Sequence, residues 1–373
     1  MELVIHCWGG DLPALQAYCA QANVTAVHVR DSCALHRACE YGHFDIVCWL
    51  WQAFQLTAAD VRAHDNYALR EACKNGHLEV ARWLQTFQLT MADAQANGNY
   101  ALREACANGH LEVARWLQRT FQLTASDARA KNNYALREAC ANGHLEVAQW
   151  LYTTFQLTAA DARIENNYAL RWACKRGRLE VAHWLQQTFQ LNVSDARIED
   201  NYALRMACVN SHFEIACWLQ QTFQLTIADA RARDNHALRI ACELGNLELA
   251  QWLQQTFELT DTDARARDYY ALRWAYFSGH LEILRWLQHT WGIPPNTIAD
   301  AVGGPKSAAC TAYLRGLRTL RWSPRTHADF PLHTRRLALL LLLINQRLTR
   351  EPGELSYLPP ELWHHLLSYL PTW

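Results

Sequence analysis

Cysteine and histidine recur together along this chain at a spacing that could bind zinc, since thiolate and imidazole are both zinc ligands. In other copies of the same segment, however, the histidine is Arg178 or Asn246 and the cysteine is Tyr276. A metal ion bound along the repeats would need its ligands at every such site, whereas packing tolerates substitution. We therefore expect buried cysteines and hydrogen-bonded histidines, with no metal. The pairs are Cys39/His43, Cys73/His77, Cys106/His110, Cys140/His144 and Cys208/His212.

The catalytic patterns in the sequence are incomplete. His77 and Glu79 resemble the first half of the zinc deaminase signature, but no Pro-Cys-x-x-Cys segment follows. The sequence also lacks a glycine-rich phosphate-binding loop, a nucleophile elbow and a paired-cysteine zinc spacing. We therefore expect neither an enzyme nor a cofactor.

These residues are positioned by a unit of 33 or 34 residues that is repeated along the chain. The copy at Asn133–Asn166 reads NYALREACANGHLEVAQWLYTTFQLTAADARIEN. A fixed period of this length predicts an all-α solenoid, in which each unit covers the apolar face of its neighbour. Counted from the alanine of the Ala-Leu-Arg/His triplet, the copies begin at Ala34, Ala68, Ala101, Ala135, Ala169, Ala203, Ala237 and Ala271.

Each unit predicts three helical segments. NYALREACANG is a short helix that ends at Gly143, because glycine favours the position after a helix C-terminus. HLEVAQWLYTTF is a second, longer helix. In LTAADAR, Thr158 and Asp161 have the form of a capping box, which predicts a third, short helix or helical turn. The asparagine-rich segment that follows is expected to form a polar turn.

Two rows of aromatic residues follow the repeat. Because they lie among apolar neighbours rather than basic ones, we predict that both rows belong to the core and do not stack on nucleic-acid bases. The first row is Trp49, Trp83, Trp116, Trp150, Trp184, Trp218, Trp252 and Trp286. The second row is Phe54, Phe87, Phe121, Phe155, Phe189, Phe223, Phe257 and Trp291.

Charge and cysteine usage indicate the cellular setting. A formal net charge of -1 at pH 7 gives no reason to expect nucleic acid as a partner. Cys39 and its equivalents in later repeats would lie about 10 Å apart, too far for disulfides. The N-terminus lacks a signal peptide, and the apolar run Leu337–Ile344 is too short to cross a membrane. We expect a soluble monomer in a reducing cytoplasm.

The segment ALHRACEYGHFDIV at Ala34–Val47 resembles the ankyrin repeat, whose units read roughly T-P-L-H-x-A-x-x-x-G-H-L-E-V-V. Later copies such as ALREACANGHLEVA keep the leucine, alanine, glycine and histidine at matching places. The family's Thr-Pro is Tyr-Ala here, and the segment from Ala160 to Arg171 is shorter than the family's β-hairpin. We therefore expect helical turns there. Such variants resemble the ankyrin families of giant DNA viruses and their amoebal hosts, which implies the host cytoplasm.

The chain divides into three predicted parts. Residues 1–320 form the solenoid, with a degenerate N-terminal copy at 1–30, eight repeats at about 31–300 and a helical cap at about 301–320. Residues 321–336 are a basic, proline-containing linker. Residues 337–373 form a separate segment with two predicted helices.

The C-terminal sequence LPPELWHHLLSYL resembles the opening of the F-box, which runs roughly L-P-x-E-L-x-x-x-I-L-S-Y-L. The match covers only the first part of an F-box, and in this it resembles the F-box-like domain of poxviral ankyrin proteins. The predicted pair of helices is also similar to the SOCS box. All three families dock onto adaptors of cullin-type ubiquitin ligases. The alternative is that both helices only cap the solenoid. The resemblance implies docking through Leu358, Pro359, Glu361, Leu362, Leu366, Leu367 and Leu370.

One position in the first helix changes character along the otherwise uniform repeats. The residue after Ala-Leu-Arg/His is charged in the first four copies and apolar in the last four: Arg37, Glu71, Glu104, Glu138, Trp172, Met206, Ile240 and Trp274. Resemblance to ankyrin proteins implies that first-helix positions line a concave binding face, where aromatic residues and methionine are typical anchors. We predict a partner-binding patch; the alternative is that this row packs against the next helix. The predicted patch is Trp172, Met206, Ile240, Trp274 and Phe277.

Together these patterns predict a substrate-recruiting adaptor. The repeats would hold an unidentified target protein while the C-terminal segment docks the Skp-type adaptor of a cullin ubiquitin ligase. Tethering the target in this way makes the transfer effectively intramolecular. The alternative is a plain protein-binding scaffold or inhibitor without a ligase.

Overall fold

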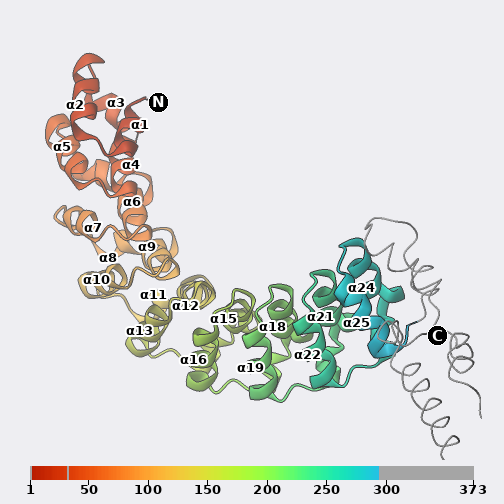
Figure 1. Ribbon diagram of the computed structural model, residues 1–373. Helices are drawn as coiled ribbons and strands as arrows, with labels where there is room; N and C mark the ends of the chain where they lie inside the picture. Colours follow the sequence, from red (N-terminus) through yellow and green to blue (C-terminus); the bar gives the residue numbers. More distant parts are fainter. Residues whose placement is uncertain (1, 32, 294–373) are drawn as a thin grey trace, which may run out of the picture. The chain divides into compact units, whose positions relative to one another are not determined.

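The computed structural model describes residues 2–31 and 33–293, and every regular element in these ranges is a helix. The helices recur in one order: a first helix with the Ala-Leu-Arg/His triplet, a second helix, and a short third helix (Figure 1). The segment where an ankyrin hairpin would project is helical, as predicted. No helix in the described part of the chain is long and apolar enough to cross a membrane.

The helices fall into four groups. The N-terminal helices are α1 (Glu2–Gly9), α2 (Leu12–Gln21) and α3 (Ala26–Asp31). The first helices are α4 (Ala34–Tyr41), α6 (Ala58–Lys74), α9 (Ala96–Ala107), α12 (Ala130–Asn142), α15 (Ile164–Lys175), α18 (Ile198–Val209), α21 (Ala232–Glu243) and α24 (Ala266–Phe277). The second helices are α5 (Phe44–Phe54), α7 (Leu78–Gln85), α10 (Leu111–Phe121), α13 (Leu145–Phe155), α16 (Leu179–Phe189), α19 (Phe213–Phe223), α22 (Leu247–Phe257) and α25 (Leu281–Trp291). The short third helices are α8 (Met91–Ala94), α11 (Ala125–Ala128), α14 (Ala159–Ala162), α17 (Val193–Ala196), α20 (Ile227–Ala230) and α23 (Asp261–Ala264).

The described part of the chain forms two compact units, which divide between Ile198 and Glu199. The predicted cap at 301–320, the linker at 321–336 and the C-terminal segment lie outside the described residues. The same holds for the predicted docking residues Leu358, Pro359, Glu361, Leu362, Leu366, Leu367 and Leu370.

The core of each repeat is built from small and branched apolar side chains of the first and second helices. In the repeat of α12 and α13, Leu136, Cys140 and Leu151 are all buried. The cysteines at the repeat position are free thiols in this core, as predicted, and burial raises the pKa of Cys140 far above its ordinary value. They are Cys39, Cys73, Cys106, Cys140, Cys174, Cys208 and Cys242.

The aromatic prediction is right for most of the phenylalanine row and wrong for most of the tryptophan row. Phe121, Phe155, Phe189, Phe223 and Phe257 are buried. The tryptophans are half-buried except Trp218, which is buried. Each tryptophan of these five repeats packs edge-to-face on the phenylalanine of its own repeat; the centroids of Trp150 and Phe155 are 5.5 Å apart at 81°. The indole therefore covers the core and keeps one side accessible to solvent.

The polar turn between repeats has a left-handed backbone. In α15, Glu165, Asn166 and Asn167 have φ values of 53°, 55° and 54°, a conformation that costs most residues about 1–2 kcal/mol and asparagine less. Arg171 of the Ala-Leu-Arg triplet holds this turn, because its Nε donates to the Asn166 carbonyl at 2.6 Å and its Nη2 to the Glu165 carbonyl at 3.0 Å. The same pair of bonds is made by Arg70, Arg103, Arg137, Arg205 and Arg239.

The capping box of the short third helix also links neighbouring repeats. Asp161 Oδ2 accepts from the backbone N–H of Thr158 at 2.7 Å, as the sequence predicts. Arg129 Nε, at the end of the preceding repeat, donates to Asp161 Oδ1 at 2.7 Å, and Asn133 Nδ2, in the same repeat as Asp161, donates to this oxygen at 3.0 Å. Burial by itself would raise the pKa of Asp161, but these hydrogen bonds outweigh it and hold the pKa well below its usual range.

The Gly-His pair joins one repeat to the next. Gly109 has a φ of 82°, and a Cβ at this position would lie 2.6 Å from Nδ1 of His144 in the following repeat. The His144 ring hydrogen-bonds the carbonyl of Ala107, and His77 Nε2 lies 3.0 Å from the carbonyl of Glu40 in the equivalent contact. This confirms the prediction of hydrogen-bonded histidines and shows that glycine is needed both for its backbone conformation and for its small size.

Candidate protein-binding surface

The acidic part of the first-helix row is used for contacts between repeats. The hydroxyl of Tyr100 donates to Glu71 Oε1 at 3.0 Å, and that of Tyr168 donates to Glu138 Oε1 at 2.6 Å. Burial, together with the neighbouring Glu138, raises the pKa of Tyr168 to about 12. In this half, packing against the next repeat is therefore the role of the row.

Trp172, in the first unit, marks the change from acidic to apolar residues. Its half-buried indole stacks on Tyr168 of the same helix, with centroids 5.3 Å apart and planes at 22°. The ammonium of Lys175 lies 4.0 Å from the centroid of the indole, which is a cation–π contact. The ring thus combines apolar area with a cation.

In the second unit the row is apolar and reaches the surface. Met206 of α18 and Ile240 of α21 are half-buried, while Trp274 of α24 is 39% exposed. Leu244, at the end of α21, is 49% exposed. Exposed large apolar side chains on successive first helices are typical of a protein-binding surface.

Aromatic packing orients Trp274. Its ring lies 5.7 Å from that of Tyr270, and 6.1 Å from that of Phe277, measured between centroids. Tyr276, which departs from the repeat at the adjoining position, is 3% exposed and occupies the core site held by cysteine elsewhere. Tyr276 and Phe277 both differ from the residues at these positions in other repeats, but only Phe277 has a partly exposed side chain.

Charged pairs link successive first helices of the second unit. Arg233 Nε lies 2.8 Å from Asp200 Oδ2, and Arg267 Nε lies 3.0 Å from Asp234 Oδ2, with all four side chains exposed. These pairs join the turn before each first helix to the turn of the next repeat.

The predicted patch left out Leu244, although comparison of the copies marks this residue, because most other repeats have Asn or Arg at its position. A second group that sequence reasoning missed is Cys33, His36 and His64, whose potential ligand atoms all lie within 4.8 Å of one another. The Cys-x-x-x-His pattern did not indicate it, because its members come from two different repeats. The signal was that the first copy has Cys33 where nearly all later copies have Tyr, and His36 where all of them have Arg.

Two family models of ankyrin repeats match the sequence. The model of three copies matches residues 3–89 and 136–229, and the model of many copies matches residues 69–118. Together these ranges make up more than half of the chain. No curated protein matches it, and the resemblance to giant-virus repeats stays a prediction. The matches agree with the helix order, the Gly-His contact and the exposed first-helix row, and the chain therefore belongs to the ankyrin-repeat family.

Proposed function

We propose that this protein is an adaptor that binds a target protein through the first helices of its second unit. Ankyrin repeats indicate a role in protein–protein interaction. The observation that carries the proposal is the pair of exposed apolar side chains, Leu244 at the C-terminal cap of α21 and Trp274 on the next first helix, α24. Met206, Ile240 and Phe277 extend this surface, and none of these side chains contributes catalytic chemistry.

We propose Trp172 as a separate contact in the first unit. Its indole offers apolar area beside the ammonium of Lys175. This combination suits a partner segment that pairs an apolar side chain with a carboxylate.

The target-binding proposal is tested with two exposed tryptophans in the full chain. Proteins captured by the wild-type chain are compared with those captured by Trp274→Ala, with Leu244→Ala added in a second variant. Trp8→Ala is the matched control, because Trp8 is also an exposed tryptophan but lies in α1. A true target loses at least about tenfold in affinity with Trp274→Ala, as expected for an aromatic anchor. If the captured proteins bind Trp274→Ala and the control Trp8→Ala with equal affinity, the proposed surface is wrong.

The finer part of the proposal concerns the C-terminal segment. We propose that the sequence Leu-Pro-Pro-Glu-Leu and the leucines after it dock a Skp-type adaptor and thereby a cullin ubiquitin ligase. Its support is the similarity of this sequence to the F-box opening. The alternative remains a protein-binding scaffold or inhibitor whose C-terminal helices form a cap.

Purified Skp-type adaptor distinguishes these two functions. Binding is measured for the full chain and for a variant that carries both Leu362→Asp and Leu366→Asp, four positions apart in the sequence. Adaptor docking predicts binding by the wild-type chain and its loss in the variant, with unchanged target binding. If the folded wild-type chain does not bind the adaptor, the ligase link is wrong and the scaffold alternative holds.

A further inference from the structure

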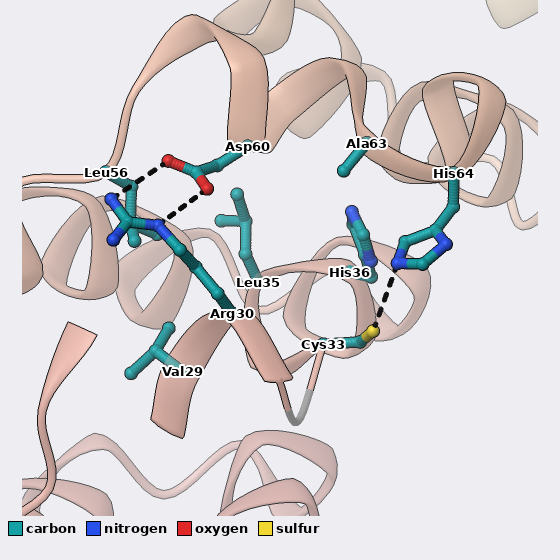
Figure 2. A pocket seen from close by; sticks show the side chains of 9 residues that line it. All are labelled: Val29, Arg30, Cys33, Leu35, His36, Leu56, Asp60, Ala63 and His64. Atoms are coloured by element: carbon teal, nitrogen blue, oxygen red, sulfur yellow. Dashed lines mark hydrogen bonds and ion pairs between the residues drawn. The ribbon is translucent and has the colours of Figure 1, made fainter. Parts of the chain in front are cut away.

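The first two repeats bring together three side chains that can each bind a transition metal. They are Cys33, at the start of α4; His36, one turn later; and His64, in the left-handed turn of α6 (Figure 2). Cys33 Sγ lies 3.7 Å from His64 Nε2, and all three ligand atoms lie within 4.8 Å of one another. Two ligands on one tetrahedral zinc are about 3.3–3.6 Å apart, given Zn–S and Zn–N bonds of about 2.3 and 2.0–2.1 Å. Closing the cluster therefore needs a movement of roughly 1.5 Å or less.

His36 is already arranged as a ligand. The residue is only 5% exposed, and its Nε2 is buried without a hydrogen-bond partner. The other side of the ring hydrogen-bonds the backbone carbonyl of Asp60. Histidine ligands usually donate their second N–H to a carbonyl or carboxylate in this way, which fixes the ring and the free nitrogen. Asp60 is itself held by Thr57 and Arg30.

The same three residues are the places where the first two copies depart from the others. In place of Cys33 the later repeats have tyrosine, except for His236 in one copy, and in place of His36 all of them have arginine. At the position of His64 no later repeat has a histidine: the residues there are Asn97, Lys131, Glu165, Glu199, Arg233 and Arg267. The first repeat thus lacks the arginine that holds the turn elsewhere. The residues found here instead are cysteine and histidine, which are the ligands that zinc prefers.

The surroundings leave room for an ion and a water molecule. Cys33, His36 and His64 line two neighbouring hollows, one towards Arg30 and Asp60, the other towards Arg37 and Tyr67. Both arginines are paired, Arg30 with Asp60 and Arg37 with Glu40, so their charges are partly neutralised. His64 is exposed and can turn towards the buried His36.

We propose that Cys33, His36 and His64 form a zinc site that joins the first repeat to the second. Zinc would be bound by Cys33 Sγ as a thiolate, whose proton is released to solvent, and by Nε2 of both histidines. Water would complete the tetrahedron. This inference does not depend on the proposed adaptor function, since it concerns the opposite end of the repeats in the sequence.

Cobalt substitution tests the site in the full-length protein, purified metal-free under a phosphine reductant. One equivalent of Co²⁺ is expected to give thiolate-to-cobalt charge-transfer absorption and the visible bands of a tetrahedral ion. One equivalent of Zn²⁺ should remove both signals. The variants are Cys33→Ser and His64→Asn, each of which should bind at least about tenfold more weakly, with the charge-transfer band lost in the first. Helix content by circular dichroism checks that each variant is folded.

His64→Asn is conservative because Asn97 has the same left-handed backbone at the equivalent position. Cys217→Ser is the matched control, since Cys217 is another half-buried thiol, in the second unit, and it should leave binding unchanged. The proposal is overturned if folded wild-type protein gives no charge-transfer band with stoichiometric Co²⁺. It is also overturned if the band persists unchanged in Cys33→Ser, which would place the ion on another thiol.

Discussion

Replacing Arg239 by methionine should destabilise the second unit far more than losing an ordinary surface charge. Arg239 is 3% exposed, and its guanidinium donates to the carbonyls of Asp234 at 2.8 Å and Arg233 at 3.1 Å. The same group lies 4.6 Å from the centroid of Tyr270 in the next repeat. Methionine keeps the apolar stem but removes both hydrogen bonds and the cation.

The expected cost follows from these contacts. Two hydrogen bonds from a charged donor contribute roughly 1.5–3 kcal/mol each, and the cation–π contact adds about 0.5–1 kcal/mol. Burial opposes this, because the pKa of Arg239 is lowered first by desolvation and then by the charge of Arg267. The free-energy cost of desolvating the guanidinium therefore offsets part of the stabilisation by these contacts. We expect a net loss of about 2–4 kcal/mol in the free energy of unfolding.

Arg265 provides the matched control in the same unit. Its Nη2 lies 2.7 Å from Asp261 Oδ2, but both side chains are exposed, so Arg265→Met should cost less than about 1 kcal/mol. Urea unfolding followed by circular dichroism measures both variants. Hydrogen exchange at the amide of Asn235, within the left-handed turn, reports whether the turn opens locally. Equal costs for the two variants would refute the conclusion that the triplet arginine stabilises the turn.

Three further predictions concern the repeat of α12 to α14. In urea unfolding, Phe155→Ala should lower the free energy of unfolding by about 3–5 kcal/mol and Trp150→Ala by about 2–3 kcal/mol, because only the phenylalanine is buried. A larger loss for Trp150→Ala than for Phe155→Ala would contradict the finding that the tryptophan row is half-buried. Stability should fall in acid, since burial lowers the pKa of His144 and hydrogen bonds lower that of Asp161. In both cases the unfolded chain binds protons first, so the histidine contribution is lost as the pH falls below about 6.5 and the aspartate contribution below about 4. Unfolding curves from pH 8 to 3 test this, and His144→Gln should flatten the upper part of the profile. Cys140 should react with iodoacetamide only after denaturation, and labelling of the native protein at this residue by mass spectrometry would show that the thiol is not in the core.

Much of the fold could be predicted from the sequence because its signals are local and repeated. The period fixed the number and order of helices, Thr158 and Asp161 indicated the short helix, and Gly143 marked the end of a first helix. Burial of the repeat cysteines followed from their position beside alanine and leucine. For the binding surface, comparison of the copies identified Trp274, but not whether it is exposed.

The tertiary structure decided which side chains meet across repeats. Arg129 and Asp161 lie 32 positions apart in sequence, and Cys33 and His64 lie 31 apart, so no local pattern relates them. Their distances depend on the register between stacked repeats and on the left-handed turns. In most of these turns the arginine of the Ala-Leu-Arg triplet hydrogen-bonds two backbone carbonyls that precede it in the chain. The sequence by itself determined the helical unit and its repetition, since propensity, capping and periodicity act within one turn or one helix. Only packing decided exposure and the zinc-type cluster, because both depend on what the neighbouring repeat covers.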